Sequence, residues 1–146
     1  MTQHQPGLPM TLLETAVLLA TMSILTLAVV QGAAATADRA AINQVQGQVL
    51  QAYREAQATA RALGGRAELL LAADSIVVRG FGPDSLIGRR RPGPRASNVG
   101  LSPASYAIVY GPDGLAMGAG NVTIVLNRGT TSRQIVVSRL GRVRLN

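Results

Sequence analysis

The stretch "PMTLLETAVLLATMSILTLAVV", from Pro9 to Val30, decides the fold of this 146-residue chain. It carries one charge, Glu14, and the 23 residues from Thr15 to Ala37 carry none. A helix rises about 1.5 Å per residue, so some twenty apolar residues cross the hydrocarbon core of a bilayer. The sequence therefore predicts a transmembrane helix segment over residues 10–37. A cleaved secretory signal ending near "QGAAATA", from Gln31, is the alternative.

The start of this helix carries a capping signal. Thr11 and Glu14 have the S/T-x-x-E spacing of a capping box, in which the two side chains satisfy free N–H groups of the first turn. A carboxylate is costly in an apolar environment, so a cap alone does not explain why it lies at the edge of a membrane-length segment.

Beyond the apolar segment, hydrophobic residues continue at intervals of three and four. This spacing forms one face of an amphipathic helix over residues 38–63, and Gly64 and Gly65 provide its end. One long helix from about Thr11 to Leu63 is predicted. Its apolar face consists of Ile42, Val45, Val49, Tyr53, Ala56, Ala60 and Leu63.

After Gly65 the hydrophobic period becomes two, which is typical of strands. The segments "AELLLA", "SIVVRGF", "SYAIVY", "NVTIVL", "RQIVVS" and "RVRL" are predicted strands. The stretch between Phe81 and Ser105 is rich in Pro and Gly and is predicted to be a long irregular loop. We expect an α+β fold in which the helix packs on an antiparallel sheet, with 38–146 as one globular domain, β-rich over 66–146.

The charge distribution is strongly asymmetric. The chain has fourteen basic residues, all Arg, and a net charge of +7. Residues 1–80 hold five Arg and five acidic residues, whereas residues 81–146 hold nine Arg against Asp84 and Asp113. An excess of this kind indicates a polyanionic partner, either nucleic acid or an anionic membrane surface.

Catalytic residues are scarce. The only histidine is His4, and the chain has no Cys and no Lys, so thiolate chemistry and a Walker motif are excluded. We therefore expect no enzyme activity, no metal site and no cofactor.

The last predicted hairpin gathers basic side chains. In a strand, Arg142 and Arg144 point to one face, about 6.6 Å apart at about 3.3 Å per residue. Arg133 and Arg139 share a strand face by parity, so four arginines are expected close together, in reach of phosphates. The alternative is a solvated edge whose arginines discourage pairing between sheets.

The loop "RRRPGPR" carries Arg89, Arg90, Arg91 and Arg95. A basic run of this kind is usually a solvated surface, and an auxiliary contact with DNA or lipid is the second interpretation. The three tyrosines, Tyr53, Tyr106 and Tyr110, are expected in the core or in cross-strand packing. Few aromatic residues favour phosphate contacts without sequence preference.

The N-terminus resembles that of type IV prepilins and pseudopilins. In that family a prepilin peptidase cuts a short leader before a hydrophobic residue that is followed by Thr, two aliphatic residues and Glu. The resemblance implies a cut between Pro9 and Met10, with Pro9 where the family has Gly, and an N-methylated Met10 as first mature residue. It also implies that Glu14 meets the N-terminal amine of a neighbouring subunit during filament assembly.

The C-terminal part, Tyr106 to Asn146, is similar to the GspH/FimT class of minor pilins. In members that act in natural transformation, a closing Gly-Arg-x-Arg contributes to DNA binding, and here it is Gly141 to Arg144. The resemblance implies a single-pass protein of the inner membrane, with its globular domain in the periplasm. Its implied partners are other pilin subunits, the prepilin peptidase and double-stranded DNA. A structural pseudopilin of a type II secretion-like system, without DNA binding, is the alternative.

Overall fold

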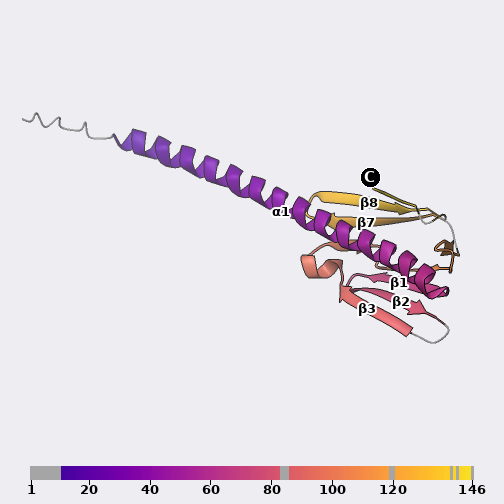
Figure 1. Ribbon diagram of the computed structural model, residues 1–146. Coiled ribbons are helices and arrows are strands. Elements are labelled where there is room, and N and C mark those ends of the chain that lie inside the picture. The colour runs from indigo at the N-terminus through magenta and orange to yellow at the C-terminus, as the bar shows by residue number, and fades with distance from the viewer. Residues whose placement is uncertain (1–10, 83–85, 119–120, 139, 141, 146) are drawn as a thin grey trace, which may run out of the picture. The chain divides into compact units, whose positions relative to one another are not determined.

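The computed structural model describes residues 11–82, 86–118, 121–138, 140 and 142–145 (Figure 1). The chain divides into two compact units after Thr36, and each is described by itself. The predicted leader, residues 1–9, and the predicted first mature residue, Met10, lie outside the described residues.

One helix, α1, runs from Leu12 to Leu63, as the sequence predicts. Its C-terminal end is a Schellman motif. The N–H of Gly64 donates to the carbonyl of Arg61, and the N–H of Gly65 donates to the carbonyl of Ala60, both at 3.2 Å. Gly64 has φ +56°, a conformation that costs glycine little, which explains why the helix ends at this residue.

The two parts of α1 have different surroundings. In the first unit the large apolar side chains between Leu12 and Val30 are exposed, and this segment is long and apolar enough to cross a membrane. In the second unit one face of α1 is buried, and it matches the predicted apolar face with two exceptions. Leu63 was predicted to be buried but is half-buried, and Ala52 is buried although it was not predicted. The buried residues are Ile42, Val45, Val49, Ala52, Tyr53, Ala56 and Ala60.

Two antiparallel sheets complete the second unit, and the second part of α1 packs on them (Figure 1). The first sheet has the order β3-β2-β1-β5-β6. Its strands are β1 (Arg66–Ala72), β2 (Ser75–Phe81), β3 (Leu86–Pro92), β5 (Ser105–Tyr110) and β6 (Ala116–Met117).

The second sheet has the order β4-β7-β8-β9. Its strands are β4 (Gly100–Ser102), β7 (Val122–Arg128), β8 (Thr131–Val137) and β9 (Val143–Leu145). All described strand pairs are antiparallel. The α+β architecture expected from the sequence is confirmed.

The long irregular loop predicted between Phe81 and Ser105 is wrong. This segment contains β3, a short 3-10 helix, η1 (Pro94–Ser97), and β4. The arginine run lies in β3, where Arg89, Arg90 and Arg91 face Val78, Val77 and Ile76 of β2. The hydrophobic pattern did not predict this strand, because a charged edge strand has no apolar alternation.

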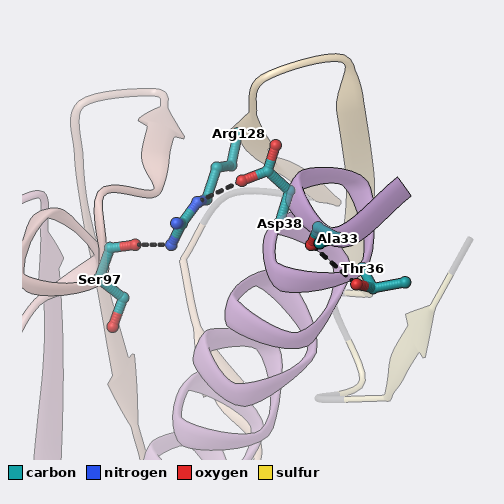
Figure 2. Close-up of polar contacts among 5 residues, drawn as sticks. All are labelled: Ala33, Thr36, Asp38, Ser97 and Arg128. Atoms are coloured by element: carbon teal, nitrogen blue, oxygen red, sulfur yellow. Dashed lines mark hydrogen bonds and ion pairs between the residues drawn. The ribbon is translucent and has the colours of Figure 1, made fainter. Parts of the chain in front are cut away.

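An ion pair joins the helix to both the second sheet and η1 (Figure 2). The Nε of Arg128 donates to Asp38 Oδ1 at 2.7 Å, and its Nη1 donates to the carbonyl of Ser97 at 2.6 Å. Both charged side chains are about three-quarters buried, with exposures of 27% and 25%. Arg128 thus ties three elements together at the beginning of the globular unit.

Candidate nucleic-acid interface

The β8–β9 hairpin presents the predicted basic residues. The register sets Val137 opposite Val143, Val136 opposite Arg144, and Ile135 opposite Leu145. Ile135 and Val137 are buried, so Arg144 and Val136 lie on the face directed away from the core. Arg144 therefore points outward from a strand whose other face contributes to the core.

A pair of hydrogen bonds closes this hairpin. The N–H of Ser138 donates to the carbonyl of Arg142 at 2.8 Å, and the N–H of Arg142 donates to Ser138 Oγ at 3.1 Å. The backbone position of Arg142 is thereby fixed beside β9. Ser138 could not be predicted from the sequence, because a serine at the end of a strand gives no signal until its partner across the turn is known.

Arg142 and Arg144 line the same surface hollow, which has a volume of about 280 Å³. The other lining residues are Asn121, Val136, Ser138 and Leu140. Both arginines are exposed. Neither guanidinium lies within 4.0 Å of a carboxylate of any residue that the structure describes. The two cations predicted to act together are therefore adjacent and available to an anion from solution.

One of the four arginines predicted to cluster, Arg133, does not lie with Arg142 and Arg144. Arg133 has the same strand parity as Ile135 and Val137, so it lies on the opposite face from Arg144. The connection between β8 and β9 determines this, because it pairs even-numbered residues of β8 with even-numbered residues of β9. Arg139 and Gly141, the other predicted members, lie outside the described residues.

Three of the four arginines in the basic run of β3 and η1 form ion pairs, with two carboxylates between them. Arg91 and Arg89 both bind Glu55 of α1, at 2.6 and 3.3 Å. Arg95 of η1 binds Asp74 at 2.9 Å. Only Arg90 of this group has no carboxylate partner among the residues described. The structure thus ties Arg91 into a covered ion pair, whereas Arg89 and Arg95 pair at the surface.

At the other end of the chain, the capping interaction at Glu14 is present. The N–H of Glu14 donates to Thr11 Oγ1 at 3.3 Å, and α1 begins at the next residue, Leu12. The Glu14 side chain is exposed in the isolated chain. The carboxylate is therefore accessible to a partner, in addition to belonging to a capped first turn.

The hydroxyl groups of the apolar segment are satisfied within the helix. Each donates to a backbone carbonyl three or four residues earlier, at 2.8 or 2.9 Å; Figure 2 shows the bond from Thr36 to Ala33. The five donors are Thr15, Thr21, Ser23, Thr26 and Thr36. Because polar groups in a bilayer must find partners inside the protein, these side chains are compatible with lipid.

Within the described ranges, no group of three His, Cys, Asp or Glu side chains is arranged to hold a metal ion. The three tyrosines are occupied in packing rather than exposed for stacking. Burial raises the pKa of Tyr53, Tyr110 and Tyr106 above the usual value of 10.0. Tyr53 and Tyr110 are buried and Tyr106 is half-buried, as expected for tyrosines in the core or between strands.

No protein-family profile and no curated protein matches this chain. Two solved structures match it, both of the type IV minor pilin FimU from Pseudomonas aeruginosa strain PAO1. In one crystal form the identity is 14%, the match covers 74% of this chain and 87% of FimU, and the TM-score is 0.54. In the other the identity is 12%, the coverage is 74% and 91%, and the TM-score is 0.51. At these identities the likeness establishes a pilin-like fold.

Proposed function

We propose that this chain is a minor subunit of a type IV pilus-like filament and that it binds double-stranded DNA without sequence preference. The pilin-like fold and the exposed carboxylate of Glu14 in the apolar segment support the filament role. In this proposal residues 12–36 anchor the chain in the inner membrane, and the globular unit lies in the periplasm. Its partners are other pilin subunits and, for the cut between Pro9 and Met10, the prepilin peptidase.

The observation that carries the DNA-binding part is the state of Arg142 and Arg144. Arg142 and Arg144 lie two residues apart, line one hollow on an outward face, and have no carboxylate partner among the described residues. Guanidinium groups bind phosphate oxygens as bidentate donors. Contacts to phosphate alone carry no sequence information, so binding without sequence preference is expected.

The experiment that tests this function is a titration of labelled duplex DNA with the full chain in a neutral detergent. The variant Arg142→Gln/Arg144→Gln is compared with Arg39→Gln/Arg66→Gln, which removes the same charge from exposed arginines on α1 and β1. We expect the first pair to lose most of the affinity and the second pair to lose little. Equal losses would attribute binding to net charge alone.

A structural pseudopilin of a secretion-like apparatus is the competing function. It predicts no binding of DNA by the unaltered chain at physiological salt. In that case the hairpin arginines would contact neighbouring subunits, and the Arg142→Gln/Arg144→Gln variant would show a defect in filament incorporation instead.

A further inference from the structure

The hollow beside Arg142 and Arg144 has a feature that phosphate binding does not require. Its lining includes two aliphatic side chains, Val136 and Leu140, and Leu140 is 63% exposed. Arginines on a flat polar face would be sufficient to hold phosphates. An aliphatic surface in a hollow next to two cations is suited to a ligand with both an apolar and an anionic part.

The hollow is built on a fixed frame. Val136 lies in β8 opposite Arg144, and the two Ser138–Arg142 hydrogen bonds hold the other rim. Asn121, directly before β7, contributes a polar group to the lining. A ligand in the hollow would therefore meet an apolar surface and two cationic side chains on a backbone that is already in place.

The unpaired charge restricts the occupant to an anion. Arg142 and Arg144 are two residues apart in extended backbone, so their Cα atoms are about 6.6 Å apart on one face. This arrangement allows them to contact successive phosphates of one nucleic-acid strand. A duplex keeps its bases stacked and offers such a site only phosphates and sugars, whereas a single strand also offers the flat apolar face of an unstacked base.

We propose that the hollow holds one nucleobase of single-stranded nucleic acid, with the flanking phosphates on Arg142 and Arg144. This inference rests on the proposed DNA-binding function and extends it to a second form of the ligand. The base packs on Val136 and Leu140, and the guanidinium planes stack against it as they do on other flat π-systems. Duplex DNA uses the arginines alone, so single strands bind more tightly per phosphate.

The test compares two oligonucleotides of equal length and equal phosphate number, oligothymidylate and an oligomer of abasic sites. Both are titrated by fluorescence anisotropy with the full chain in a neutral detergent, and a duplex of the same length is the third probe. We expect oligothymidylate to bind about fivefold or more tightly than the abasic strand, the low end of what one stacked base contributes.

Leu140 provides the matched variants. Leu140→Asn should lower the affinity for oligothymidylate by about fivefold or more, and the affinities for the abasic strand and the duplex by clearly less. Leu140→Trp should increase the preference, because an indole stacks on a base. Leu115→Asn, at another exposed leucine outside the hollow, should leave all three affinities as they are. The exposure of Leu140 makes these changes compatible with folding, which circular dichroism checks.

The outcomes separate the two proposals. Equal affinities for the thymidylate and abasic strands would overturn the nucleobase site and leave the proposed function intact. Absence of binding to all three probes would overturn the proposed function as well. Binding of the chain to vesicles containing phosphatidylglycerol that is lost in Leu140→Asn, together with equal affinities for the thymidylate and abasic strands, would assign the hollow to an anionic lipid and overturn the nucleobase site.

Discussion

At the scale of single residues, Glu55 shows how the fold uses charge. Its side chain is only 16% exposed; it accepts a hydrogen bond from Arg91 and forms a second ion pair with Arg89, both on an edge strand. Arg91 is itself mostly covered, with 32% exposure, so this contact is protected from water. The same strand carries Arg90 without a carboxylate partner among the described residues. Neighbouring arginines in one run therefore have different roles.

Replacing Glu55 by Gln is expected to lower the free energy of unfolding by about 1 to 3 kcal/mol, because Arg91 would keep a partly buried charge without its counterion. The matched control is Asp74→Asn, whose ion pair with Arg95 is exposed on both sides, at 67% and 72%. That change should cost less than about 1 kcal/mol. Urea denaturation of residues 37–146 followed by circular dichroism measures both, and equal effects would refute the burial argument.

The two buried tyrosines limit the stability of the fold at alkaline pH. The hydroxyls of Tyr53 and Tyr110 have no hydrogen-bond partner within the described part of the chain, and burial raises the pKa of both. Because folding raises the pKa of each hydroxyl, its contribution to the free energy of unfolding is complete below the unfolded pKa of about 10. This contribution is lost as the pH rises above that value.

We expect Tyr53→Phe to leave the stability at neutral pH unchanged or higher, because no protein hydrogen bond is lost. The variant should also unfold at a higher pH than the unaltered chain, since one ionisable group is removed. Thermal unfolding measured between neutral pH and pH values above about 10 tests both points. A clear loss of stability at neutral pH would mean that the hydroxyl does have a partner in solution.

At the scale of elements, periodicity predicted α1 well and the β-rich region less completely. The helix could be predicted from the spacing of its hydrophobic residues at intervals of three and four, and its end from the Gly64–Gly65 pair, because both signals are local. β3 and the ion pairs of Glu55 were missed, because a strand of arginines is recognised only from its partner, β2, and from a helix residue 36 positions away. The position of Arg133 was misassigned for a related reason: strand parity is local, whereas the register between β8 and β9 depends on the turn.

Glu14 belongs to the capped first turn of α1 and has a proposed role in filament assembly, and two variants in this turn separate the two. Glu14→Ala should leave membrane insertion intact, because a charge is removed from an apolar segment, and should reduce incorporation into filaments. Thr11→Ala is the control, since it removes the capping hydroxyl at a cost of about 1 kcal/mol but keeps the carboxylate. The ratio of sheared filament to membrane-bound protein measures the effect. Equal defects in the two variants would reduce Glu14 to a helix cap.

At the scale of the whole molecule, the chain combines a pilin-like fold, a membrane-length apolar segment and a basic hairpin. These features lie in separate parts of the sequence, and the role proposed for one can be wrong while the roles proposed for the others are right. The processing of the N-terminus and the binding of DNA are therefore tested separately.

Processing is tested by mass spectrometry of the protein extracted from membranes. A prepilin-type protein should yield a mature chain that begins at Met10. Pro9→Gly should accelerate the cut, because proline fixes its backbone and lacks an N–H group at a position where the resembled family has glycine. A chain that keeps Met1, or one that begins between Ala33 and Ala37, would contradict the pilin-type processing.

The most direct test of the central claim is the salt dependence of binding to duplex DNA. Each arginine that contacts a phosphate releases counterions, so the logarithm of the binding constant falls with the logarithm of salt concentration by about 0.9 per contact. The Arg142→Gln/Arg144→Gln variant should have a slope smaller in magnitude by about 1.8, with its fold unchanged by circular dichroism. An unchanged affinity and slope in this variant would show that Arg142 and Arg144 do not touch DNA.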